Sequence, residues 1–147
     1  MNKCLFVYGT LRKEAETYFS AQLRRRAVSI GLAYLRAQLF LIEDYPGAID
    51  SHNQNHRVLG EVYMLPQGED RTDLLRFIDQ YEECGPNDPP PTEYIRVERP
   101  VELLSGETII AYVYLYTCSI EQLTLIEDGD FLSIKDGQKS KYNEIGR

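Results

Sequence analysis

Cys4-Leu5-Phe6-Val7-Tyr8-Gly9-Thr10-Leu11 is a short apolar run that stops at a glycine followed by a hydroxyl residue. Its length and its aromatic and β-branched side chains favour a buried strand over a helical turn. Glycine enters positive φ without a steric penalty and lets the backbone come close to a ligand. If Gly9, Thr10 and Leu11 turn sharply, their N–H groups converge into a small anion-binding concavity that suits a carboxylate. The same residues also fit an ordinary strand end with a turn glycine.

The composition is that of one acidic domain spanning 1–147. A chain of 147 residues can bury most of the surface that its unfolded form exposes. It has 16 Lys and Arg against 23 Asp and Glu, a net charge of -7. The basic residues are scattered apart from Arg24-Arg25-Arg26, which suit the C-terminal end of a helix. Nucleic acid is therefore not expected as a partner.

Cysteine and histidine usage predicts neither disulfides nor a metal site. Cys4, Cys84 and Cys118 are odd in number and lack metal-type spacing. His52 and His56 are four apart, but their Asn and Ser neighbours predict a polar loop. The N-terminus does not resemble a signal peptide, and no apolar segment is long enough to cross a bilayer. We expect a cytoplasmic protein without a membrane partner.

Hydrophobic periodicity predicts two helices, over 13–26 and 70–83, and at least six strands. The strands are expected within 4–8, 28–34, 39–42, 56–65, 94–103 and 108–118. Residues 43–48, with Pro46 and Gly47, are expected to form a turn, and Asp70 to cap the second helix. Residues 84–91 are a proline-rich loop, and 133–147 are expected to form a mobile tail. Short turns favour an α+β fold, a largely antiparallel sheet or small barrel with helices against it.

Glu82 is a carboxylate on the apolar face of the second predicted helix. At about 100° per residue, Leu74, Ile78 and Tyr81 form one arc, and Glu82 projects inside it. Burial of a carboxylate is costly and raises its pKa toward the range useful for proton transfer, so Glu82 is a candidate general acid/base. Two alternatives stay open. Glu82 lies in a frayed last turn and reaches solvent, or it pairs with an arginine such as Arg96.

The chain is rich in tyrosine, with 11 Tyr and no Trp. Most of these side chains are expected to pack their rings and satisfy their hydroxyls within the protein. A few members of the set are expected to line a polar pocket beside Glu82; the set includes Tyr8, Tyr45, Tyr94, Tyr112, Tyr114 and Tyr116. Asp79 lies at the border of the same helix face and is expected to be solvated or to cap a neighbouring turn. No Ser/His/Asp arrangement, phosphate loop or dinucleotide fingerprint is present.

Two motifs together resemble the γ-glutamylcyclotransferase-like family, and most closely its γ-glutamylamine cyclotransferase branch. They are a strand ending in Tyr8-Gly9-Thr10-Leu11 and a helix ending in Asp79-Gln80-Tyr81-Glu82. Further matches follow in order: Gly31-Leu32-Ala33-Tyr34, Tyr45-Pro46-Gly47-Ala48, Val58-Leu59-Gly60-Glu61-Val62-Tyr63, Tyr94-Ile95-Arg96, Ala111-Tyr112-Val113-Tyr114 and Gly129-Asp130-Phe131. The resemblance covers nearly the whole chain.

The resemblance implies a small mixed, largely antiparallel β-barrel flanked by two main helices, with the glycine loop and Glu82 facing one cavity. It implies no metal and no organic cofactor. In enzymes of the family, the α-amine of a γ-glutamyl group attacks its own γ-carbonyl, giving 5-oxoproline and a free amine or amino acid. Glu82 is then the catalytic residue, and we expect a monomer or weak homodimer. The expected substrate-binding residues are Tyr8, Gly9, Thr10, Leu11, Tyr45, Tyr112 and Tyr114.

The chain departs from the family pattern at two places. Glu83 stands where the family commonly has glycine, and residues 84–91 are an elaboration. Glu83 either crowds the entrance or raises the pKa of Glu82 further, and the loop is expected to shape substrate choice. An alternative function is a non-catalytic binding module for a small carboxylated ligand in the same cavity. A purely structural domain is a third possibility, which predicts no cavity.

Overall fold

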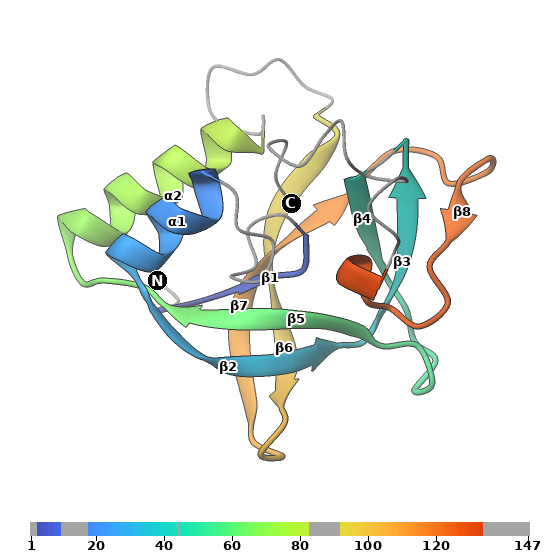
Figure 1. Ribbon diagram of the computed structural model, residues 1–147, viewed down its shortest axis with the longest axis horizontal. Helices are drawn as coiled ribbons and strands as arrows, with labels where there is room; N and C mark the ends of the chain where they lie inside the picture. The colour runs from blue at the N-terminus through green and yellow to red at the C-terminus, as the bar shows by residue number, and fades with distance from the viewer. Residues whose placement is uncertain (1–2, 10–17, 44, 83–91, 134–147) are drawn as a thin grey trace.

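The computed structural model describes residues 3–9, 18–43, 45–82 and 92–133 (Figure 1). In chain order the elements are β1 (Cys4–Val7), α1 (Tyr18–Arg26), β2 (Val28–Leu35), β3 (Ala37–Ile42), β4 (Tyr45–Asp50), β5 (Val58–Met64), α2 (Glu69–Tyr81), β6 (Tyr94–Leu103), β7 (Thr108–Tyr116), β8 (Thr124–Leu125) and the 3-10 helix η2 (Phe131–Ser133). The predicted α+β class is confirmed. The proline-rich loop and residues 134–147 of the predicted tail lie outside the described residues.

Five strands close into a barrel in the order β1-β5-β2-β6-β7. Four of the neighbouring pairs are antiparallel. The barrel is closed by a parallel pairing of β1 with β7, where Leu5 lies opposite Tyr112. The predicted mixed, largely antiparallel barrel is therefore confirmed, and β1 lies between two strands that come much later in the chain.

The turn predicted over 43–48 is wrong from Tyr45 onward, because Tyr45–Asp50 forms strand β4. The chain reverses around Glu43, which has a positive φ of 55°. β4 pairs with β3 in a second sheet of order β4-β3-β8, separate from the barrel (Figure 1). Pro46 is tolerated because β4 is an edge strand of this sheet, where a missing N–H removes no necessary ladder bond.

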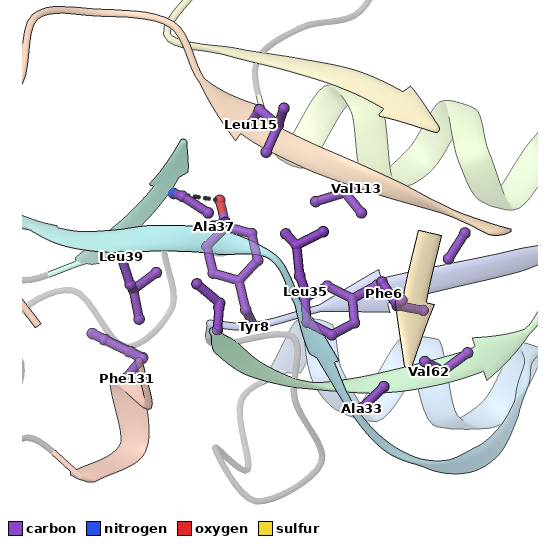
Figure 2. Packing of buried hydrophobic residues seen from close by; sticks show 14 of the residues in the cluster. Phe6, Tyr8, Ala33, Leu35, Ala37, Leu39, Val62, Val113, Leu115 and Phe131 are labelled. Atoms are coloured by element: carbon purple, nitrogen blue, oxygen red, sulfur yellow. Dashed lines mark hydrogen bonds between the residues drawn. The ribbon is translucent and has the colours of Figure 1, made fainter. Parts of the chain in front are cut away.

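Two hydrophobic clusters lie on opposite faces of β1. Phe6 and Tyr8 belong to the cluster that fills the barrel and reaches the second sheet (Figure 2). Leu5 and Val7 belong to the other, which packs against the helices. Successive side chains of a strand point to opposite faces, so four consecutive buried residues serve both clusters. This explains why the run reads as continuously apolar.

The helices pack side by side on one side of the barrel (Figure 1). The ring of Phe19 in α1 lies 3.6 Å from that of Tyr81 in α2, centroid to centroid. Leu23 supplies the buried apolar contact of α1, whereas Tyr18 is 60% exposed. The predicted cap at Asp70 is wrong: Gly68, with φ 65°, is the N-cap of α2, and Asp70 lies in the first turn.

Candidate functional site

Glu82 follows α2 directly and is completely buried, with 0% of its side chain exposed. Its backbone keeps a helical conformation (φ −82°, ψ 0°), and its N–H donates to the carbonyl of Ile78 at 2.9 Å. Both carboxylate oxygens are shielded from solvent. The helical hydrogen bonding therefore continues to Glu82. The alternative in which the last turn is frayed and Glu82 reaches solvent is wrong.

Arg96 pairs with Asp79 and not with Glu82. Its Nε and Nη2 donate to the two carboxylate oxygens of Asp79 at 2.9 and 3.0 Å. Such a two-point bond between guanidinium and carboxylate fixes orientation as well as supplying attraction. Burial acts to lower the pKa of Arg96, but the hydrogen bonds and charge of Asp79 outweigh it and raise that pKa. The expectation that Asp79 is solvated or caps a turn is wrong.

Two candidate tyrosines on β7 complete this network. The hydroxyl of Tyr114 donates to Oδ1 of Asp79 at 2.5 Å. The Arg96 guanidinium lies 4.6 Å from the centre of the Tyr112 ring, within the range of a cation–π contact. Arg96 is also opposite Tyr114 in the β6–β7 register. Strand pairing therefore brings the arginine and both tyrosines to the last turns of α2.

Tyr8 is completely buried in the cluster that fills the barrel and reaches the second sheet. Its hydroxyl donates to the carbonyl of Tyr114 at 2.5 Å. The same hydroxyl accepts the N–H of Ala48 at 3.2 Å, which is the dashed line at Tyr8 in Figure 2. The side chain thus ties the end of β1 to β7 and β4, and its role in substrate binding stays a prediction. Gly9 is buried at the bend after β1. Thr10 and Leu11 lie outside the described residues.

Tyr45 packs, half-buried, against the cluster that faces the helices. Next to it in sequence, the carbonyl of Pro46 accepts the hydroxyl of Tyr94 at 2.6 Å, which links β4 to β6. The structure thus gathers Tyr45, Tyr112 and Tyr114 around the same cluster that holds the inner face of α2.

Glu61 is a second buried carboxylate, which sequence reasoning did not single out. It is 5% exposed, lies opposite Val7 in the β1–β5 register, and accepts the Ser29 hydroxyl at 2.9 Å. A signal was present: Glu61 is the one charged residue within 58–65, and it alternates with Tyr63 on the same strand face. Its partner Val7 is two residues before Gly9, so Glu61 lies beside the end of β1.

The described part of the chain holds neither a cluster of metal-binding side chains nor a membrane-spanning helix. Within those ranges, no group of three or more His, Cys, Asp or Glu side chains is placed to hold a metal ion. In the predicted polar loop, His56 pairs through Nδ1 with the Ser51 hydroxyl at 2.7 Å. Neither α1 nor α2 has the length and apolar character needed to cross a membrane.

A family model described as gamma-glutamyl cyclotransferase, AIG2-like, matches residues 5–133. The chain belongs to this family. The chain is similar in sequence to gamma-glutamylaminecyclotransferase B of Danio rerio, with 31% identity over 125 residues. The match covers 77% of this chain and 58% of the relative, so the chain spans well under two thirds of that protein's length.

Solved structures show the same fold. YkqA from Bacillus subtilis superposes with a TM-score of 0.67 at 26% identity, over 95% of this chain and 43% of that one. An AIG2-like protein from Mus musculus superposes with a TM-score of 0.65 over 85% of this chain and 86% of its own. Its identity is 23%, so that likeness concerns the fold alone. The resemblance inferred from the two motifs is confirmed at the level of family and fold.

Proposed function

We propose that this chain is a γ-glutamyl cyclotransferase that converts the γ-glutamyl group of a small molecule into 5-oxoproline and releases an amine or amino acid. The observation that carries the proposal is the complete burial of Glu82 at the end of α2. Membership of the family supports it. So does the name of the relative from Danio rerio, which is a γ-glutamylamine cyclotransferase.

The reaction needs one proton acceptor that later becomes a donor. The substrate's α-amine nitrogen attacks its γ-carbonyl carbon, a C–N bond forms, and the original amide C–N bond breaks. Glu82 takes a proton from the attacking nitrogen and gives it to the leaving nitrogen, so no proton is gained or lost overall. Burial disfavours the charged form of a carboxyl, which suits a group that must both take and give a proton near neutral pH.

The remaining groups bind and orient the substrate in this proposal. Amides of the loop beginning at Gly9 hold the substrate's α-carboxylate or the oxyanion that forms on the γ-carbonyl. Tyr45 and Tyr112 supply rings and hydroxyls around the cluster beneath α2, and Tyr114 supplies its ring, because its hydroxyl donates to Asp79.

The direct test incubates the purified protein with a panel of γ-glutamyl amines and γ-glutamyl amino acids and measures 5-oxoproline and the released amine. Wild type should turn over at least one of them, and Glu82→Gln should lower kcat by about 100-fold or more. Because Gln has nearly the same shape and no charge to bury, its melting temperature at pH 7 should match or exceed that of wild type. Asp73→Asn is the matched control, since Asp73 is 60% exposed on the same helix.

Two outcomes contradict the proposal in different ways. Binding of 5-oxoproline by calorimetry without any turnover would identify a binding module for carboxylated ligands. A Glu82→Gln variant that melts far below wild type would show that the carboxylate is structural.

A further inference from the structure

Asp79 joins the end of α2 to the barrel by hydrogen bonds. It precedes Glu82 by three residues, a spacing that makes helix positions neighbours. Its two oxygens accept three hydrogen bonds, two from Arg96 and one from the Tyr114 hydroxyl. Only 14% of the side chain is exposed. All three bonds come from strands of the barrel, so they tie α2 to β6 and β7.

Tyr114 carries the connection on to the glycine loop. Its hydroxyl donates to Asp79, while its backbone carbonyl accepts the hydroxyl of Tyr8. Tyr8 is the residue before Gly9. Two successive hydrogen-bond steps thus connect the start of the glycine loop to the last turn of α2, where Glu82 is held by its bond to Ile78.

Apolar packing alone would not hold α2 at one rotation. Leu74, Leu75 and Ile78 fill the helix-facing cluster, but the attraction of buried apolar surface is not directional. The bonds to Asp79 are directional, and the fork of Arg96 admits one arrangement of the carboxylate. A misplacement of about 1 Å at a reacting group can cost about 100-fold in rate.

We propose that Asp79 is a positioning residue that holds Glu82 at a fixed place relative to Tyr8 and Gly9, through Tyr114 and Arg96. The inference rests on the proposed function and deepens it. Asp79 acts through the helix backbone, and its own carboxylate remains engaged with Arg96 and Tyr114 during turnover.

Two variants separate the bonds. Asp79→Asn keeps the side-chain volume but places an amide NH2, which cannot accept a hydrogen bond, against the guanidinium or the hydroxyl. Tyr114→Phe removes only the hydroxyl. The backbone carbonyl of residue 114 can still accept the Tyr8 hydroxyl. Asp73→Asn again is the control, because it makes the same charge change on the same helix at an exposed position.

On the best substrate, Asp79→Asn should lower kcat by about 10-fold to 100-fold with KM within about threefold of wild type, and Tyr114→Phe should lower it by less. The pH profile of kcat should also move, because the surroundings of Glu82 change. Assays are run well below the melting temperature of each variant. A fall in kcat that only follows the fraction of folded protein, with an unaltered pH profile, would overturn the proposal.

A second measurement does not depend on turnover. Amide hydrogen exchange at Glu82 should be at least about tenfold faster in Asp79→Asn, while amides in β5 keep their wild-type rates. If the Glu82 amide of Asp79→Asn exchanges at the wild-type rate, the positioning role is overturned even when the enzyme is active. Faster exchange in a protein that makes no 5-oxoproline would instead show that Asp79 holds the helix and that the proposed function is wrong.

Discussion

At Gly60 the barrel wall leaves no room for a side chain. A Cβ there would lie 2.5 Å from the carbonyl oxygen of Val7 and 2.6 Å from a ring carbon of Phe6. The missing side chain leaves room for the Phe6 ring and lets the backbone of β1 lie close to β5. Glycine is therefore required at position 60 of β5 so that β1 can pack against it.

Gly60→Ala should therefore lower the free energy of unfolding by about 2–3 kcal/mol through overpacking, at the upper end of the usual range. Gly106→Ala is the comparison, because nothing lies within 4 Å of its Cβ and only its φ of +98° is strained. That change should cost about 1 kcal/mol. Urea unfolding of both variants checks the order, and a Gly60→Ala variant as stable as Gly106→Ala would contradict the packing argument.

At the scale of elements, an ion pair links β4 of the second sheet to β6 of the barrel. Nε and Nη2 of Arg99 donate to the two oxygens of Asp50 at 2.9 and 2.8 Å. The hydrogen bond from Arg99 is the largest influence on the carboxyl and holds the pKa of Asp50 below its ordinary value. The Asp50 side chain is 47% exposed and that of Arg99 is 35% exposed. Solvent therefore screens the pair, which contributes less than about 1 kcal/mol.

The sign of the pH dependence follows from the lowered pKa. Asp50 stabilises the fold above its unfolded pKa of about 3.9, and this contribution is lost as pH falls through the lower folded value. Asp50→Asn should thus melt slightly below wild type at pH 7, and the difference should shrink as the pH falls below about 3.9. Thermal melts across pH test this, with Glu98→Gln on the exposed side of β6 as control. A difference that grows as the pH falls would contradict it.

At the scale of the whole molecule, the segment after β8 closes the barrel-filling cluster. Phe131 is 1% exposed within that cluster. The carbonyl of Gly129, two residues earlier, accepts the N–H of Leu59 at 2.8 Å. The chain around Gly129 also passes so close to the carbonyl of Arg57 that only glycine fits. The described C-terminal part is therefore built into the same core as β5.

Phe131→Ala should lower the free energy of unfolding by about 3–5 kcal/mol, because a large buried ring is lost and leaves a cavity. That is a large share of the stability of an ordinary domain, so expression at 37 °C should suffer as well. Leu125→Ala, at a side chain 40% exposed on β8, is the control and should cost much less. Chemical unfolding followed by fluorescence and circular dichroism measures both. A separate early transition in wild type would show that this segment unfolds independently.

The sequence by itself determined the two main helices, six of the strands and the place of Glu82 on the apolar face of the second helix. Strand alternation and helix periodicity depend on residues two to four apart, and the two main helices and the six predicted strands all occur in the described chain. The same arithmetic placed Glu82 with Ile78 on one face, and the structure buries both. The family motifs also stood in the sequence, because they are runs of consecutive residues.

Only the tertiary structure decided which polar groups meet. Asp79 and Arg96 are 17 residues apart, and Asp79 and Tyr114 are 35 apart. Their contact depends on the register of β6 against β7 and on where α2 lies across the barrel. Likewise, Tyr45–Asp50 became a strand because β3 offered it a paired edge, although Pro and Gly locally favour a turn. Interactions between distant segments produce no periodic pattern in the sequence, so the sequence could not predict them. They outweighed the local turn preference at β4 and paired Arg96 with Asp79.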